Sequence, residues 1–235
     1  MAEKNGDSYR AQTLLLYQAW LHLHAMDFGG VAEICESILP SLGDPPRSPW
    51  RRLCLVLLGS AQTALGNYER ARENLSMAGS EMASQKVIHD WYWRMMLESG
   101  LTELWLAKGD LPQARCHARQ LLSTTQSTPE RTWQALAWEA NARAAFAELD
   151  LETARDFITK ALLLLEGGWE VPLAAWRVHA TGADISEQMG NSGLAEYHRQ
   201  LTRATILKLA NSLPGEEPLR ETFLSAAPIR KVLET

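Results

Sequence analysis

The sequence predicts an all-α fold: a right-handed solenoid of about five helical hairpins, closed at its C-terminal end by short capping helices. Three observations predict it: a turn phrase that recurs along the chain, small residues at fixed distances from each turn, and helix breakers between the hairpins. The central residues of the turn phrase are Met26, Gly66, Gly109, Leu149 and Gly190. Successive centres are 40, 43, 40 and 41 residues apart, and a period in this range is typical of stacked helical hairpins.

Small or β-branched residues stand seven positions before and five positions after each turn centre. Antiparallel helices whose axes lie about 8–10 Å apart need short side chains where they cross, so we expect these positions to be the crossing points. They are Ala19, Gly59, Thr102, Ala142 and Ala183 before the turns, and Val31, Ala71, Ala114, Ala154 and Ala195 after them. Two positions after the centre, an apolar residue is expected to plug each turn. These residues are Phe28, Tyr68, Leu111 and Leu151, and Ser192 breaks the rule in the last hairpin.

The hairpins follow in chain order, each as a first helix and a second helix. The ten helices are expected at 9–25 and 28–41, 49–65 and 68–83, 88–108 and 111–126, 130–148 and 151–166, and 171–189 and 192–212. Helix breakers fall between them at Gly43-Asp44-Pro45-Pro46, at Ser127-Thr128-Pro129 and at Gly167-Gly168. At Thr128-Pro129 a capping hydroxyl precedes a Pro, which is a helix start signal.

The tail differs from the hairpins. Residues 213–218 contain two prolines and a glycine that end the last long helix, and short helices are expected through about Leu224 and from Pro228. Solenoids need terminal elements that cover the apolar face of the last repeat. Phe223, Leu224, Ile229 and Val232 are expected to form that cover. We therefore divide the chain into a repeat domain, 1–213, and a capping segment, 214–235.

The second hairpin resembles the tetratricopeptide repeat. It contains Leu58-Gly59, Gly66, Tyr68, Ala71, Leu75 and Ala78 in the order of that motif. Trp138 with Asn141-Ala142, and Trp105 before Gly109, fill the aromatic positions of other hairpins. The period exceeds the roughly 34 residues of the ordinary repeat, which implies longer helices. In such arrays the first helices line a concave groove.

A second resemblance is to the C-terminal helical-repeat regions of large bacterial regulators, of the maltose-regulon activator type, their LuxR-family relatives and cyclase-linked or kinase-linked regulators. It is carried by Trp20, Asp27-Phe28 and Cys35-Glu36, by residues 66–71, and by Ser212-Leu213-Pro214 with residues 219–224. It implies a non-catalytic interaction or sensor module in bacterial signalling or transcription regulation.

Composition limits the function classes. Hydrophobic residues make up 46% of the 235 residues, and the formal net charge is −5, so the chain as a whole has no attraction to nucleic-acid phosphates. Three cysteines without a CxxC pair, Cys35, Cys54 and Cys116, indicate reduced core thiols in a cytoplasmic protein. The polar N-terminus predicts no signal peptide, and no apolar run approaches the roughly 20 residues that span a bilayer.

No motif for catalysis or for a cofactor is present. The sequence contains no phosphate-binding GxxxxGK[ST] loop, no GxGxxG, no HExxH and no GxSxG. His22 and His24 point to different faces of a helix, so they are not expected to chelate one metal ion. We therefore expect no enzyme activity, no metal and no cofactor.

The nine tryptophans all fall in first helices or just before them. They are Trp20, Trp50, Trp91, Trp93, Trp105, Trp133, Trp138, Trp169 and Trp176. Trp50, Trp93 and Trp133 each lie 16 positions before a turn centre, which indicates one recurring site. They are expected to pack between repeats as hydrophobic wedges, and a ligand-stacking ladder is the alternative.

The groove position lies six residues before each turn centre. It holds Trp20, Ser60, Glu103, Arg143 and Asp184, so the last three hairpins present acid, base and acid. Glu139 and Arg177 extend this polar surface. Exposed ion pairs contribute only about 0–1 kcal/mol each, so two interpretations stay open: a structural ion ladder or a polar ligand site.

Two functions follow from this surface. The first is a protein or peptide partner in the concave groove, with homo-oligomers possible and with neither nucleic acid nor membrane as a direct partner. The second is a small-molecule site around Glu103, Glu139, Arg143 and Asp184. A wide open channel favours the peptide, and a closed pocket favours the metabolite.

Overall fold

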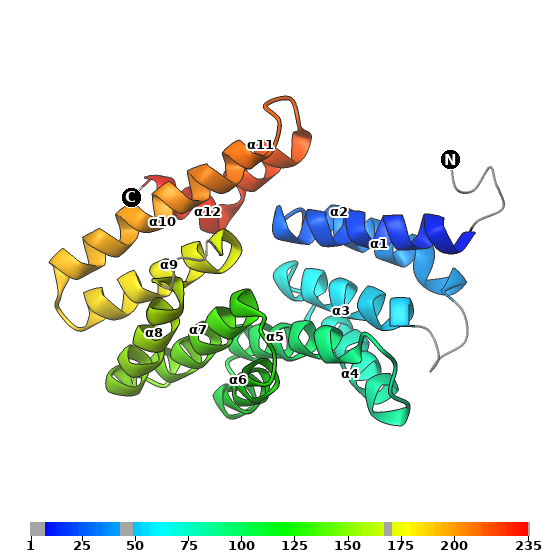
Figure 1. The fold of residues 1–235 in the computed structure, drawn as a ribbon, viewed down its shortest axis with the longest axis horizontal. Helices are drawn as coiled ribbons and strands as arrows, with labels where there is room; N and C mark the ends of the chain where they lie inside the picture. The colour runs from blue at the N-terminus through cyan, green and yellow to red at the C-terminus, as the bar shows by residue number, and fades with distance from the viewer. Residues whose placement is uncertain (1–7, 43–48, 167–170, 235) are drawn as a thin grey trace. The chain divides into compact units, whose positions relative to one another are not determined.

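The computed structural model describes residues 8–42, 49–166 and 171–234, and this part of the chain is all-helical, without a strand (Figure 1). It divides into two compact units, Met1–Lys108 and Gly109–Thr235, and each is described by itself. The first contains α1 (Ser8–His24), α2 (Phe28–Ile38), the 3-10 helix η2 (Leu39–Ser41), α3 (Pro49–Ala64), α4 (Tyr68–Ser84) and α5 (Asp90–Lys108). The second contains α6 (Leu111–Gln126), α7 (Arg131–Ala147), α8 (Leu151–Leu165), α9 (Pro172–Gln188), α10 (Ser192–Ser212), α11 (Pro218–Ser225) and α12 (Ala227–Glu234).

The ten predicted hairpin helices are present, with ends within two residues of the predicted ones if η2 is counted with α2. The segment predicted as one helix over 28–41 changes to a 3-10 turn after Ile38, because Pro40 has no N–H to continue the α-helical hydrogen bonds. The breakers Gly43–Pro46 and Gly167-Gly168 lie outside the described residues, as does Trp169.

The five turn centres share one backbone conformation. Each has a positive φ: 59° at Met26, 79° at Gly66, 74° at Gly109, 61° at Leu149 and 77° at Gly190. In four of the turns the next residue donates its N–H to the carbonyl five positions back, as Asn67 does to Gln62 at 2.8 Å. This is the left-handed helix end that glycine favours. The recurring Gly is therefore explained by the backbone that the turn requires.

The Asp or Asn after each centre starts the second helix. Its side chain accepts a hydrogen bond from the backbone N–H three residues later, which satisfies a donor that the first helical turn leaves open. Asp27, Asp110, Asp150 and Asn191 all do so, at 3.1 to 3.2 Å. Asn67 makes no such bond.

The helices of each unit pack in one recurring order. In the first unit α2 contacts α1 and α3, α4 contacts α3 and α5, and α3 also contacts α1 and α5. In the second unit α6 contacts α7, α8 contacts α7 and α9, and α9 also contacts α7 and α10. Thus α2, α4 and α8 each pack on the first helix before them and on the first helix after them, and α6 packs on α7. All ten small residues at the predicted crossing points are buried.

The C-terminal segment packs on α10. Both α11 and α12 contact α10 and each other, and they bury Phe223 and Ile229. The Arg203 side chain of α10 donates to the Val232 carbonyl at 3.1 Å. Leu224 and Val232 are half-buried. The cover of the last hairpin therefore rests mainly on Phe223 and Ile229.

One of the three cysteines predicted to be core thiols lies at the surface. Cys35 and Cys54 are buried, but Cys116 is exposed, because it lies on the outer side of α6, between the buried Ala114 and Ala118. Hydrogen bonding to Cys35 and burial raise the pKa of the Cys54 thiol. None of the described helices is long and apolar enough to cross a membrane.

Candidate functional site

The six predicted site residues fall in both units. Trp20 on α1 and Glu103 on α5 belong to the first unit, and both are half-buried. Glu139 and Arg143 on α7, and Arg177 and Asp184 on α9, belong to the second unit. The structure brings Arg143 and Arg177 to within 4 Å of the Glu139 carboxylate.

That carboxylate is Glu139, whose side chain is only 3% exposed. Its Oε1 accepts a hydrogen bond from the Thr181 hydroxyl at 2.9 Å. The Arg143 Nε lies 3.7 Å from Oε1, and the Arg177 Nη2 lies 3.8 Å from Oε2. We call Glu139, Arg143, Arg177 and Thr181 the Glu139 cluster.

The two arginines of the Glu139 cluster face solvent in part, since the Arg143 side chain is 31% exposed and that of Arg177 30%. Their distances to Glu139 exceed the 2.7–3.2 Å of a good N–H···O hydrogen bond. Arg143 is four residues after Glu139 on the same helix, whereas Arg177 reaches it from α9. The result is a buried carboxylate within 4 Å of two arginine side chains that are partly exposed.

Asp184 lies near the same surface. Desolvation raises the pKa of its carboxyl, while the positive charges of Lys231, Arg199 and Arg143 act in the opposite direction. Arg143 is thus a common neighbour of Asp184 and Glu139. The predicted pairing of Arg143 with acids is therefore closest at Glu139, with Asp184 as a second acidic neighbour.

Trp20 belongs to an aromatic cluster of the first unit, made of Tyr17, Trp20, Trp50, His89, Tyr92 and Trp93. The Trp20 ring contacts those of Tyr92 and Trp93, with centroids 5.7 and 5.9 Å away. Trp50 and Trp93 contact each other at 6.3 Å. With Trp133 they hold the recurring position 16 residues before a turn, and all three are buried. These ring contacts agree with packing of the tryptophans between first helices. Among the described residues, the buried Nε1 of Trp20 has no hydrogen-bond acceptor.

A histidine pair joins α9 to α10. The Nδ1 atoms of His179 and His198 are 3.1 Å apart, so one ring donates to the other. Burial lowers the pKa of His179 to about 4, with a smaller contribution from His198, and burial also lowers the pKa of His198. A side chain at Gly182 would place its Cβ 3.3 Å from the His198 ring. The pair is therefore neutral at pH 7 and closely packed.

A fully buried arginine fixes the connection between α4 and α5. Arg52 of α3 is 0% exposed and donates to the carbonyls of Glu81 and Gln85, each at 2.8 Å. It also contacts the carboxylate of Asp90, which accepts from the Val87 N–H at 2.8 Å. Asp90 begins α5 two residues later than predicted. Sequence reasoning missed this site, because Arg52 follows another arginine and its partners lie 29 to 38 residues away.

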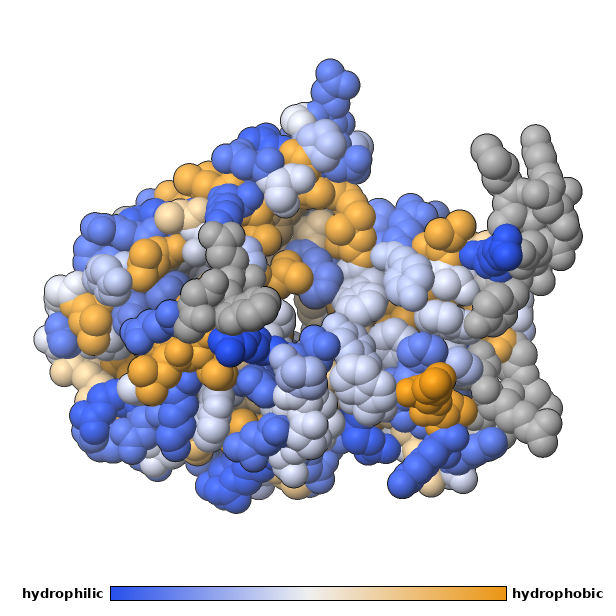
Figure 2. Space-filling model, in the orientation of Figure 1, coloured by the Kyte–Doolittle hydropathy of each residue, from blue (hydrophilic) through white to orange (hydrophobic). Residues whose placement is uncertain are grey.

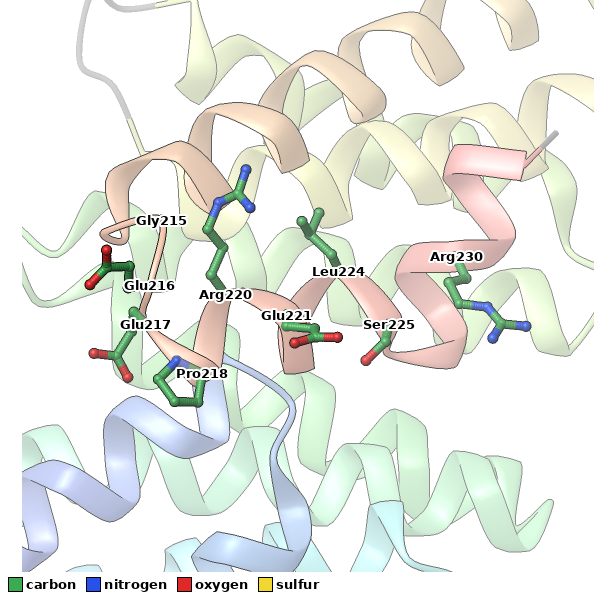
Figure 3. A pocket seen from close by; sticks show the side chains of 9 residues that line it. All are labelled: Gly215, Glu216, Glu217, Pro218, Arg220, Glu221, Leu224, Ser225 and Arg230. Atoms are coloured by element: carbon green, nitrogen blue, oxygen red, sulfur yellow. The ribbon is translucent and has the colours of Figure 1, made fainter.

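A shallow depression of about 680 Å³ lies beside the C-terminal segment (Figure 3). It is lined by the loop at 215–217, by α11 and by Arg230 of α12. Figure 3 shows the Glu216 and Glu217 carboxylates at one end and Arg230 at the other. Arg220 turns toward α10, where it donates to the Asn211 side chain at 3.3 Å. None of its polar side chains is buried, so this depression is a weaker candidate than the Glu139 cluster.

No protein-family model matches the sequence, and a search of the curated proteins finds no match.

Proposed function

We propose that this chain is a helical-repeat binding module that takes up a carboxylate-bearing segment of a partner protein through Arg143 and Arg177. In this proposal the five hairpins continue one another as a solenoid of tetratricopeptide type. The module serves a cytoplasmic bacterial signalling or transcription regulator, as the sequence resemblance suggests, and it binds without catalysing a reaction. The single observation that carries the proposal is the pair of arginine side chains, each about 30% exposed, that lie beside the buried Glu139.

Stability alone is a poor reason for this arrangement. A buried ion pair recovers its desolvation cost only if the geometry is excellent, and here both arginines lie more than 3.5 Å from Glu139. A carboxylate that is 3% exposed costs free energy unless it is paired and hydrogen-bonded. The Glu139 cluster thus maintains a charged group at a place where apolar residues would stabilise the fold at least as well.

The same arrangement suits recognition of an acid. Glu139 anchors the two guanidinium groups from the protein side, while about 30% of each side chain faces solvent. A guanidinium presents five N–H donors in a planar fork that matches a carboxylate. A partner carboxylate can therefore approach the outer side of Arg143 and Arg177 and make charge-assisted hydrogen bonds with both.

The test uses a peptide selected for binding. A library of 15-residue random peptides, displayed on phage, is panned on the purified chain, and the best binder is measured by fluorescence anisotropy. We expect Asp, Glu or a free C-terminus at one position of the binder. Because a hydrogen bond to a charged group contributes about 1.5–3 kcal/mol, Arg143→Ala should weaken binding at least tenfold. Arg143→Lys keeps the charge but loses the planar fork, so its loss should be intermediate.

Arg155→Ala is the matched control, because Arg155 is an exposed arginine of α8 in the same unit. It should bind like wild type and keep the wild-type Tm, whereas the two Arg143 variants should lose more in binding than in Tm. Unchanged peptide capture by Arg143→Ala together with a large loss of stability would mean that the Glu139 cluster is structural. A free dicarboxylate that competes for the site as strongly as the peptide would favour the small-molecule function instead.

A further inference from the structure

The outward side of α1 carries three large hydrophobic residues that water reaches. Leu14 is 64% exposed, Tyr17 48% and Leu21 48%. They follow one another at the i, i+3 and i+7 spacing that places side chains on one side of a helix. We call Leu14, Tyr17 and Leu21 the α1 outer face. Figure 2 shows hydrophobic side chains at the surface where α1 and α2 lie in Figure 1.

The turn register shows what this face corresponds to in the other hairpins. Leu14, Tyr17 and Leu21 lie 12, 9 and 5 positions before the turn centre Met26. All twelve residues at these positions in α3, α5, α7 and α9 are buried. They are Cys54, Leu57 and Ala61; Leu97, Gly100 and Leu104; Ala137, Ala140 and Ala144; and Val178, Thr181 and Ile185.

In those hairpins the face is covered by the second helix that precedes it in the chain. The Cys54 thiol of α3 donates to the Cys35 carbonyl of α2 at 3.5 Å. In α5, a Cβ at Gly100 would lie 3.3 Å from the Leu75 side chain of α4. The helices α6 and α7 are in contact, and Val178 and Ile185 of α9 share a hydrophobic cluster with residues of α8. One kind of interface therefore occurs four times, with a second helix on the same face each time.

The covering helices share one apolar stripe. Counted from their turn centres, positions 5, 9 and 12 are buried in α2, α4, α6 and α8, and position 5 is Ala in α4, α6 and α8 and Val in α2. The stripes are Val31, Cys35 and Ile38; Ala71, Leu75 and Ala78; Ala114, Ala118 and Leu121; and Ala154, Ile158 and Ala161. Small residues let two helix backbones approach closely. Because Leu14, Tyr17 and Leu21 are bulky, a helix that packs on them needs small residues at the contact.

We propose that the α1 outer face is the docking site for one amphipathic helix of a partner protein, which packs on α1 as α2 packs on α3 and α4 on α5. The docking helix carries a small residue, an aliphatic residue four positions later and a small or aliphatic residue three positions after that. Its burial removes the exposed apolar surface of α1 from water. The proposal does not rest on the Glu139 cluster, which belongs to the other unit and is tested by other variants.

The probe is a synthetic peptide of residues 68–84, the sequence of α4 with Glu73→Lys, held helical by a lactam that joins the side chains at positions 69 and 73. Both stapled positions are exposed in the structure, so the staple leaves the apolar stripe open. Binding of the labelled peptide to the full chain is measured by fluorescence anisotropy. We expect saturable binding that weakens at least tenfold in the Leu14→Glu/Leu21→Glu variant.

Two matched controls make the result specific. Leu163 and Leu207 are 60% and 47% exposed, so Leu163→Glu/Leu207→Glu places two equivalent charges on other helices and should bind the peptide like wild type. In the peptide, replacing Ala71 and Ala78 by Lys should remove binding, because both residues belong to the buried stripe of α4. Circular dichroism checks that both double variants keep the wild-type helix content.

Three results would overturn the proposal. The first is no saturable binding of the stapled peptide to wild type. The second is equal binding by wild type and the Leu14→Glu/Leu21→Glu variant. The third is a wild-type dimer in sedimentation velocity that this variant dissociates, which would assign the α1 outer face to a second copy of the chain.

Discussion

Leu149→Gly should stabilise the protein, although it removes a large side chain. Leu149 holds the left-handed turn position with φ of 61°, where three of the other four hairpins have glycine. That conformation costs a residue with a Cβ roughly 1–2 kcal/mol, whereas glycine loses about 0.5–1 kcal/mol more conformational freedom on folding. The Leu149 side chain is 75% exposed, so little packing is lost. The net gain in unfolding free energy is about 0.5–1 kcal/mol.

The assay is thermal unfolding followed by circular dichroism. For a chain of this size 1 kcal/mol shifts Tm by about 2–4 °C, so Leu149→Gly should raise Tm by about 1–4 °C. Leu149→Ala keeps the Cβ in the left-handed region and should leave Tm almost unchanged. The reverse test is Gly66→Ala, since a Cβ at Gly66 has no atom within 4 Å; it should lower Tm by a similar amount. A neutral Gly66→Ala, or a Leu149→Gly that lowers Tm, would refute the role given to the turn backbone.

Three further predictions concern packing and pH. Burial holds the pKa of His179 at about 4, below its usual 6.5, so as pH falls the unfolded chain takes up a proton at this histidine before the folded chain does. The free energy of unfolding should therefore decrease as pH drops from about 6.5 toward 4. In urea unfolding measured over this pH range, His179→Gln should weaken the dependence on pH. Ala142→Leu should lower the free energy of unfolding by about 1–3 kcal/mol, because it overpacks a helix crossing. Ala147→Leu, at an exposed position of the same helix, should leave it unchanged. Equal losses of stability in both variants would show that the register is wrong. Deleting residues 214–235 uncovers the side of α10 that Phe223 and Ile229 cover, so light scattering should detect aggregation while circular dichroism keeps most of the helix signal; a monomeric truncation with an unchanged Tm would contradict the capping role.

The helices and turns could be predicted because their signals are local. A left-handed helix end followed by an Asx cap requires a few residue types within a short segment, and five copies at a near-constant interval make the pattern visible. The small or β-branched residue seven positions before each turn indicates where the packed helices cross.

The polar contacts could be predicted only in part. The register placed Glu139, Arg143, Arg177 and Asp184 on one surface, but it could not show that Glu139 would be the buried member. Arg52 and the His179–His198 pair were missed altogether. Their partners come from other helices, 19 to 38 residues away, and no short pattern distinguishes a buried arginine or histidine from an exposed one.

The repeat also gives a way to separate surfaces used for folding from surfaces left for binding. A position that is buried in every hairpin serves the packing of the helices on one another, and the small residues on both sides of the turns are of this kind. A position that is buried in four hairpins and exposed in one needs a different explanation, because the residue type alone does not account for the difference. Leu14, Tyr17 and Leu21 are apolar like most of their counterparts, yet only they are exposed. The register therefore indicates that the α1 outer face binds a helix, which its exposed hydrophobic area alone would not show.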